Sequence, residues 1–385
     1  MTGMRVGVDA TSWDNRRGYG RFARNAVGRL VELDRDTTYV LCVDEGGDAG
    51  LPARAERLDV TTSRPSAEAA SARSHRRALD LLRLSRAVGR AGLDCFLFPS
   101  VYTYFPVRGV PAIVGIHDTT VLDHPELTLP SRRARAFWRL KERHAVRHAA
   151  RVFTVSEAAR AAVADGFGLD EKRIAVVPEA PDPVFHPRPV AEADGDLTTL
   201  GVPAGPYLLY AAGISPHKNV ETLLDAFAAL ADPPPLVLVG ALEDEPYLSA
   251  AASVHDRIER LPPSHTAVLT GFVPDETLAR LYSAATVVVC PSLAEGFGLP
   301  PVEAAACGAA VLLSDLPAHR ETLGAGALYF PPTDTAELAR QLERLLADAE
   351  LRSSLAARGR EAVAPLSWDA SAERLRELVH EVAGG

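Results

Sequence analysis

At 385 residues the chain is too long for one ordinary domain, and an apolar content of 47% is enough to fill two cores. No apolar run reaches the length that a membrane-spanning helix needs, and the N-terminus lacks the features of a secretory signal. The four cysteines have no regular spacing, which is typical of buried free thiols. We therefore expect a cytoplasmic protein without disulfides or a zinc site.

Charge is unevenly divided along the chain. The net charge is -9, yet residues 1–185 carry 28 Lys and Arg against 23 Asp and Glu, and the remainder carries 13 against 27. An acidic half that binds an anion must use local donors rather than bulk charge. We interpret the excess of basic residues in the first half as the solvated faces of Arg-rich helices. The alternative interpretation is that they contact an anionic surface.

The first half alternates short apolar runs with longer segments of helical spacing. The helical candidates include Phe22–Leu33 and Arg132–Ala150. This alternation predicts a parallel sheet with helices on both faces. The expected strands are Arg5–Asp9, Thr38–Val43, Phe96–Pro99, Ala112–Ile116, Arg151–Thr154 and Ile174–Val177.

The second half repeats the pattern after a Pro-rich stretch from Pro181 to Pro206. We predict an N-terminal domain over 1–185, a linker over 186–206, a C-terminal domain over 207–367 and a terminal helix over 368–385 that crosses back. Two doubly wound α/β domains would then face a central cleft, with ligands at the carboxyl ends of the strands. The expected strands are Tyr207–Ala211, Leu236–Val239, Ala267–Leu269, Thr286–Cys290, Ala310–Ser314 and Ala327–Phe330.

The most informative block follows the strand that ends at Cys290. Its loop contains Glu295-Gly296-Phe297-Gly298, and a helix expected to start near Pro301 carries Glu303 in its first turn. Main-chain N–H groups at such a loop and helix start attract anions, and glycines let the backbone approach closely. Glu303 is suited to accept from ribose hydroxyls, and Glu295 either to hold sugar hydroxyls or to oppose developing positive charge. This block predicts a nucleotide diphosphate site.

A second block agrees with the first. Residues 213–219, Gly-Ile-Ser-Pro-His-Lys-Asn, follow a strand and open a helix. Lys218 is the only lysine of the acidic half, and its ammonium is suited to neutralise charge on a leaving diphosphate. In the first half, Gly18-Tyr19-Gly20-Arg21 precedes a helix, and His117-Asp118 stands at the carboxyl end of a strand.

These motifs resemble the family 4 retaining glycosyltransferases, which have the GT-B fold and an E-x7-E signature, here Glu295 and Glu303. The resemblance implies that Glu295 lies by the donor sugar, that Glu303 binds the ribose, and that the amides of Gly298 and Leu299 meet the diphosphate. His117 corresponds to a histidine that contacts the donor sugar. The resemblance covers nearly the whole chain.

Further residues take their expected roles from the same resemblance. Gly18–Arg21 corresponds to a loop that approaches the diphosphate and acceptor, Gly271-Phe272-Val273 to the region that holds the base, and Gly213 to the donor-binding loop. The chain departs from the family at His217, where an arginine is frequent, and at Pro178-Glu179-Ala180, where the family often has Pro-Asn-Gly.

The expected reaction is a retaining, metal-independent transfer of a hexosyl group from a UDP- or GDP-sugar to a hydroxyl. His117, Glu295 and Lys218 form the expected catalytic set, without metal or cofactor, and nucleic acid is not an expected partner. The acceptor is a saccharide, an aminocyclitol or another small molecule, bound by first-domain loops that include Asp118, Tyr102 and Tyr104. The sugar, the base, the linkage and the oligomeric state stay open.

Three rival functions remain. The basic segment Arg132–Arg151, with Phe137 and Trp138, fits a peripheral membrane enzyme that uses a lipid-linked acceptor. A nucleotide-sugar epimerase and a non-catalytic sugar-nucleotide sensor are the others. We interpret Asp34-Arg35-Asp36 as a solvated turn, and His144 with His148 as part of a basic helix face rather than zinc ligands.

Overall fold

The computed structural model describes residues 3–13, 15, 18–44, 50–63, 77–189, 197–240 and 248–384. These residues form two compact units. Unit 1 consists of Met1–Pro125, Leu129–Glu179 and Ser367–Gly385, and unit 2 consists of Glu126–Thr128 and Ala180–Leu366. The first boundary thus follows Glu179, before the expected domain end at residue 185. Within the expected linker, residues 190–196 lie outside the described residues and Thr198–Leu200 form a 3₁₀ turn of unit 2.

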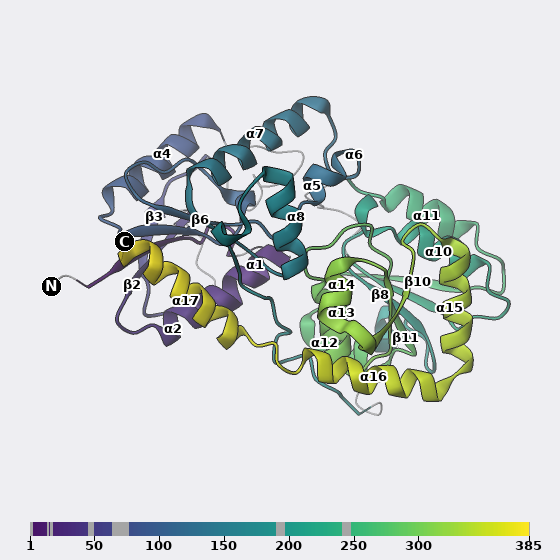
Figure 1. Cartoon of the computed structure of the whole chain (residues 1–385). Helices are drawn as coiled ribbons and strands as arrows, with labels where there is room; N and C mark the ends of the chain where they lie inside the picture. Colours follow the sequence, from purple (N-terminus) through teal and green to yellow (C-terminus); the bar gives the residue numbers. More distant parts are fainter. Residues whose placement is uncertain are drawn as a thin grey trace. The chain divides into compact units, whose positions relative to one another are not determined.

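A parallel sheet of seven strands lies at the centre of unit 1, in the order β3-β2-β1-β4-β5-β6-β7 (Figure 1). All six predicted strands are present, with small shifts of their ends. The edge strand β3 was not predicted, because only Leu58 and Val60 interrupt its charged residues. The strands are β1 Arg5–Asp9, β2 Thr38–Asp44, β3 Glu56–Val60, β4 Cys95–Phe98, β5 Ala112–Gly115, β6 Ala149–Thr154 and β7 Ile174–Val176.

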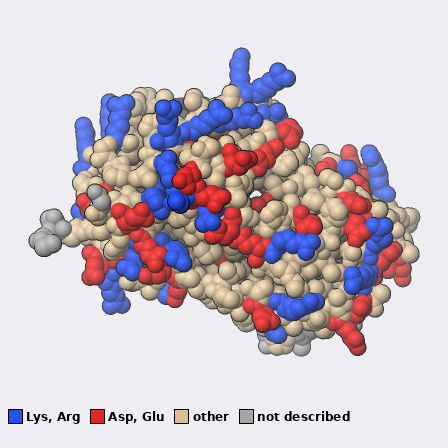
Figure 2. All heavy atoms as spheres, viewed as in Figure 1, with Lys and Arg blue, Asp and Glu red and all other residues tan. Residues whose placement is uncertain are grey.

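Helices cover both faces of this sheet (Figure 1). The predicted helix over 22–33 starts earlier, at Gly18, and contains a π-helical turn, while the predicted helix over 132–150 ends at His148 because Ala149 begins β6. Lys and Arg side chains project along the side of unit 1 that carries α4 and α7 (Figure 2). The helical segments are α1 Gly18–Phe22, η1 Ala23–Val27, α2 Gly28–Leu33, α4 Ala78–Arg90, η2 Val101–Thr103, α5 Thr120–Asp123, α6 Pro125–Thr128, α7 Arg132–His148, α8 Glu157–Phe167, η3 Glu171–Arg173 and α17 Trp368–Gly384.

The C-terminal helix α17 packs against α2 and η1 in unit 1. Its His380 Nε2 lies 2.8 Å from Asp34 Oδ2, which also accepts a hydrogen bond from the Tyr39 hydroxyl. Asp34 is 4% exposed. Our interpretation of this residue as part of a solvated turn was therefore wrong: a buried carboxylate needs hydrogen-bond partners, and a helix more than 300 residues away supplies one.

Unit 2 repeats the architecture with a parallel sheet of six strands in the order β10-β9-β8-β11-β12-β13. All six strands were predicted. They are β8 Leu208–Ala211, β9 Leu236–Val239, β10 Ala267–Gly271, β11 Val287–Cys290, β12 Val311–Ser314 and β13 Ala327–Phe330. The helical segments are η5 Pro216–Lys218, α10 Val220–Ala228, α11 Ala251–Glu259, α12 Asp275–Ala284, α13 Leu299–Ala306, α14 Pro317–Leu323, η6 Gly324–Gly326, α15 Thr335–Ala347 and α16 Ala349–Val363.

Each sheet contains one point where the strand order reverses. In unit 1 it lies between β1 and β4, and in unit 2 between β8 and β11. Loops that leave neighbouring strands at such a point diverge to opposite faces, and ligands of doubly wound sheets bind in the crevice between them. The loop of residues 213–219 follows β8 and the Glu295 loop follows β11, so both sequence blocks meet at the reversal point of unit 2.

Candidate functional site

Asn219 fixes the loop that follows β8. It is the one non-glycine residue among the described residues with a positive φ, at 57°. Its side-chain amide donates to the carbonyl oxygens of Pro291 (3.0 Å) and Pro332 (2.9 Å), while its Oδ1 accepts from Thr222 (2.7 Å). The left-handed backbone is tolerated because these bonds tie it to the loops after β11 and β13. Asn219 thereby sets the position of its neighbour Lys218.

Lys218 and Glu295 form an ion pair at the centre of this site. The ammonium nitrogen lies 2.7 Å from Glu295 Oε1, which also accepts from the Ser292 hydroxyl at 2.7 Å. The two side chains are only 18% and 13% exposed. Because the pair is poorly exposed, water and salt screen its charges weakly. The ammonium can therefore act at short range on an anion that binds beside it, although Glu295 offsets part of its field.

The charge of Glu295 is held by its neighbours. Burial raises the pKa of this carboxyl group, but Lys218, His319 and the Ser292 hydrogen bond outweigh burial and keep the pKa at about 2. Glu295 is therefore a carboxylate at neutral pH, and at that pH it can accept hydrogen bonds but cannot donate one.

His319 lies beneath the same loop and was not singled out by the sequence. It is fully buried, and its Nδ1 lies 2.8 Å from the Ser314 carbonyl oxygen. A carbonyl only accepts, so Nδ1 carries the proton and Nε2 is left with a lone pair. Within the described residues, Nε2 has no hydrogen-bond partner. Burial lowers the pKa of His319, which keeps the ring neutral near pH 7.

Gly298 joins the Glu295 loop to α13 in a conformation that requires glycine. Its φ is +86°, and a Cβ at this position would lie 2.9 Å from the Cδ2 atom of His319. Pro300 and Pro301 have no N–H group. The main-chain donors left at this helix start are therefore the amides of Gly298 and Leu299. These are the two amides that we expect to meet the diphosphate.

The helix start corrects the expected place of Glu303. Because α13 begins at Leu299 rather than near Pro301, Glu303 lies in its second turn, and it is 3% exposed. Phe297 in the loop is also buried, at 5% exposure.

The remaining predicted donor residues surround the same end of the sheet. The Gly213 carbonyl accepts from the Tyr210 hydroxyl, and the carbonyl of His217 accepts from the Leu293 N–H. The His217 side chain is 5% exposed, so it does not reach outward as an arginine would.

The segment expected to hold the base follows β10. Gly271 has a φ of +72°, Val273 is buried, and the ring of Phe272 is 53% exposed. This segment stands at the edge of the sheet, two strands from β8.

In unit 1, His117 is held on both sides. Its Nε2 lies 2.8 Å from the Pro99 carbonyl oxygen and therefore carries a proton, while Nδ1 faces Glu179 Oε1 at 3.6 Å. Glu179 stands where the family pattern often has asparagine, so this departure places a carboxylate beside the predicted catalytic histidine. Asp118 accepts the Thr120 N–H at 2.8 Å and so shapes the following turn.

The glycine pair of the first domain lies inside α1 rather than before a helix, together with Tyr19 and Arg21. A Cβ on Gly20 would lie 2.0 Å from the Asn15 carbonyl oxygen. The Tyr19 ring stacks on Tyr102, with centroids 5.0 Å apart, at the reversal point of this sheet. These two rings form an aromatic surface in the predicted acceptor region.

Tyr104 does not belong to that surface. It is 7% exposed, packs against Phe98, and its hydroxyl lies 3.0 Å from His144 Nδ1. These contacts give Tyr104 a packing role, and its contact with an acceptor stays a prediction. Within the described part of the chain, no group of three or more His, Cys, Asp or Glu side chains is placed to hold a metal ion.

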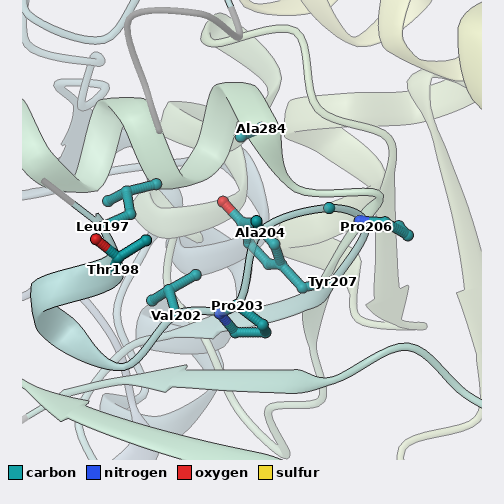
Figure 3. Close-up of a pocket in the computed structure, with 9 residues that line it drawn as sticks. Leu197, Thr198, Val202, Pro203, Ala204, Pro206, Tyr207 and Ala284 are labelled. Carbon is teal, nitrogen blue, oxygen red and sulfur yellow. The ribbon is translucent and has the colours of Figure 1, made fainter. Parts of the chain in front are cut away.

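A cavity of about 320 Å³ lies elsewhere in unit 2 (Figure 3). It is lined by Leu197, Val202, Pro203, Tyr207 and Ala284, among others. Tyr207 directly precedes β8, so this cavity lies at the amino end of the strand whose carboxyl end leads to Lys218. It is therefore distinct from the site described above.

Known families match both halves of the chain. Residues 16–184 match the family described as Glycosyltransferase Family 4, and residues 202–362 match Glycosyl transferases group 1. The O-antigen chain mannosyltransferase B of Escherichia coli is 30% identical over 273 residues, which cover 69% of each chain. The alpha-D-kanosaminyltransferase of Streptomyces kanamyceticus is 28% identical over 319 residues, 78% of this chain and 79% of that protein.

Solved structures share the fold of the whole chain. Sucrose-phosphate synthase from Thermosynechococcus elongatus has a TM-score of 0.77 at 20% identity, with 99% of each chain covered. Anabaena HepE in complex with UDP-glucose has a TM-score of 0.71 at 18% identity, again with 99% of each chain covered. The chain is therefore a glycosyltransferase of family 4 with the GT-B fold.

Proposed function

We propose that this enzyme transfers a hexosyl group from a UDP- or GDP-sugar to a hydroxyl of a saccharide, an aminocyclitol or another small molecule, with retention of configuration and without a metal ion. The observation that carries the proposal is the pairing of Lys218 with Glu295 at the strand-order reversal of unit 2. The solved complexes of Anabaena HepE contain UDP and UDP-glucose, which supports a nucleotide-sugar donor.

In this proposal the diphosphate lies over the start of α13. The amides of Gly298 and Leu299 donate to its oxygens, and the Lys218 ammonium neutralises the charge that builds up as it leaves. These groups supply the positive charge that a metal ion supplies in other transferases. Glu295, held as a carboxylate, accepts hydrogen bonds from the sugar hydroxyls, and Glu303 binds the ribose.

The chemical step exchanges one bond at the anomeric carbon for another. The bond from this carbon to the departing phosphate oxygen breaks, and the acceptor oxygen bonds on the same face. The acceptor proton passes to the leaving phosphate, so no protein group is required as a base. His117, with its Nε2 proton directed to Pro99 and Glu179 beside Nδ1, orients the sugar rather than attacking it.

Unit 1 provides the acceptor contacts in this proposal. The stacked rings of Tyr19 and Tyr102 offer an aromatic edge, and the Tyr102 ring also packs against Trp138 at 5.1 Å. Sugars and other saturated rings pack favourably on such aromatic surfaces.

The test is an incubation of the enzyme with a panel of UDP- and GDP-sugars and acceptors, in EDTA, with the product followed by NMR. We expect one donor to yield a glycoside with the donor's anomeric configuration. An inverted product, or a requirement for a divalent metal, would contradict the proposal. Conversion of the nucleotide sugar without an acceptor would instead indicate an epimerase, and binding without turnover a sensor.

A further inference from the structure

Exposed large apolar side chains concentrate on two helices of unit 1. Of the six such residues in the described part of the chain, Leu79 and Leu82 belong to α4, and Phe137 and Leu140 belong to α7. Their exposed fractions are 66%, 49%, 49% and 68%, respectively. Paired exposed apolar side chains on a soluble surface mark an interaction site more often than single ones do.

Helix α7 separates its residues sharply between two faces. Ala145 and Val146 are buried against the sheet, whereas Phe137 and Leu140 are exposed three residues apart and so share a face. Arginines flank this apolar pair on the exposed side of the helix. They are Arg132, Arg133, Arg139, Arg143 and Arg147.

Helix α4 has the same organisation. Leu84 and Val88 face the core, and Leu79 and Leu82 are exposed three residues apart. The exposed arginines here are Arg83, Arg86 and Arg90. Two separate helices thus combine an exposed apolar pair with a row of cations.

Neither helix contributes an exposed acidic side chain of its own to this surface. The one acid of α7, Glu142, is 4% exposed, and burial raises its pKa to about 7. The one acid of α4, Asp80, is 3% exposed and accepts hydrogen bonds from the Ser63 side chain and backbone. Asp80 also forms an ion pair with Arg83, at 3.3 Å, and so offsets one arginine of α4. Arg86 and Arg90 of α4 and the exposed arginines of α7 supply the remaining positive charge of this side.

Both helices cover the same face of the unit 1 sheet, opposite α2 and α17 (Figure 1). Figure 2 shows Lys and Arg side chains along that side of unit 1. We refer to the exposed residues of α4 and α7 named above as the basic-apolar face. We propose that this face binds the surface of an anionic lipid bilayer, with Phe137, Leu140, Leu79 and Leu82 inserted beside the headgroups and the arginines on the lipid phosphates.

The chemistry favours a lipid surface over a nucleic acid. A helix that combines cations with aromatic and aliphatic side chains lies in the plane of the bilayer interface. There the apolar side chains are buried among the lipids and the cations are attracted to the anionic headgroups. On a nucleic-acid backbone only the cations would make favourable contacts, and the apolar side chains would stay exposed. Such binding is peripheral, and no helix within the described ranges is long and apolar enough to cross a membrane. The proposal does not depend on the identity of the donor or acceptor.

The experiment is sedimentation of the full chain with vesicles of phosphatidylcholine alone or with about one third phosphatidylglycerol. We expect binding to the anionic vesicles only, and weaker binding at high salt. The variant Phe137→Ala/Leu140→Ala should lower the partition coefficient by roughly tenfold or more, because it removes the inserted groups. Leu33→Ala is the matched control, since Leu33 is 43% exposed on α2 and lies on the opposite face.

Thermal unfolding of each variant checks that truncating these exposed side chains leaves the fold intact. The proposal is overturned if the wild-type chain does not bind anionic vesicles. It is also overturned if Phe137→Ala/Leu140→Ala binds them as tightly as the wild type and the Leu33→Ala control do. Competition by duplex DNA or RNA that is indifferent to the apolar substitutions would show a general polyanion surface instead. Because vesicle binding requires no turnover, its failure is distinguishable from failure of the proposed reaction.

Discussion

The ammonium of Lys218 lies 2.7 Å from the carboxylate of Glu295, although the two residues are 77 positions apart in the chain. They meet because β8 and β11 are neighbours at the point where the strand order of unit 2 reverses. Both side chains are poorly exposed, so each charge depends on the other for the stabilisation that water would otherwise provide. The pair therefore links the stability of the site to its expected chemistry.

A double-mutant cycle should measure this dependence. Lys218→Met or Glu295→Gln alone should lower the free energy of unfolding by about 2–4 kcal/mol, because each leaves a poorly exposed partner without its counter-charge. The double variant should lose less than the sum, with a coupling energy of about 1–3 kcal/mol in urea unfolding. The matched control is the exposed pair Arg374 and Glu377, whose coupling should stay below about 0.5 kcal/mol. Equal coupling in both pairs would contradict this account.

The low pKa of Glu295 predicts a pH dependence of stability. Its pKa is about 2 in the folded chain, against 4.5 for the ordinary group. A lowered folded pKa contributes stability above the unfolded value, and this contribution is lost as the pH falls from about 4.5 toward 2. The difference in unfolding free energy between wild type and Glu295→Gln should thus be constant from pH 7 to 5 and shrink below pH 4.5. A difference that disappears between pH 7 and 5 would be inconsistent with this pKa.

Gly298 should tolerate no side chain. Gly298→Ala combines a positive φ with a Cβ that meets the His319 ring at 2.9 Å, so we expect weaker binding of the donor and a stability loss of about 2 kcal/mol or more. Gly168→Ala is the control, because Gly168 has a φ of +65° but open space around its Cβ position. That variant should lose only about 1 kcal/mol. Similar losses for both would show that contact with His319 is unimportant.

Asn219 should be needed for its amide as well as for its backbone. Asn219→Gly keeps the left-handed conformation but removes the bonds to Pro291 and Pro332, so it should cost about 1–3 kcal/mol in chemical unfolding. Asn219→Ala loses the same bonds and adds backbone strain, so it should cost about 1 kcal/mol more. If the glycine variant were as stable as the wild type, the bonds would have no structural role.

Much of the fold was predictable because both sheets are parallel and buried on two faces. Such strands are continuous apolar runs, as in Val287–Cys290, and they are recognised without knowledge of their partners. The edge strand Glu56–Val60 carries charges and gives no such signal. The burial of Asp34 was missed for a related reason, since its partner His380 lies at the other end of the chain.

The site was predictable to the extent that its residues form local motifs. Glu295, Gly298 and Lys218 stand in short blocks at strand ends, which is why the sequence singles them out, and the structure brings Lys218 and Glu295 into contact. Their roles in donor binding stay predictions. Asn219 and His319 act through contacts with distant segments, which no local spacing reveals. The sequence offered only an asparagine, a residue type that tolerates positive φ, directly after the lysine, and a histidine shortly after the next strand. The burial of Tyr104 was also not predictable from local sequence, since an aromatic residue in a loop can still belong to the core.

In our proposal, main-chain amides and the Lys218 ammonium of unit 2 bind a nucleotide diphosphate. Calorimetric titration of the enzyme with UDP, GDP and ADP tests it directly. We predict that at least one of them binds and that Lys218→Ala/Glu303→Ala weakens its affinity by about 100-fold or more, while Lys172→Ala, in unit 1, leaves it unchanged. The claim is contradicted if none of the three binds, or if a correctly folded double variant binds as tightly as the wild type.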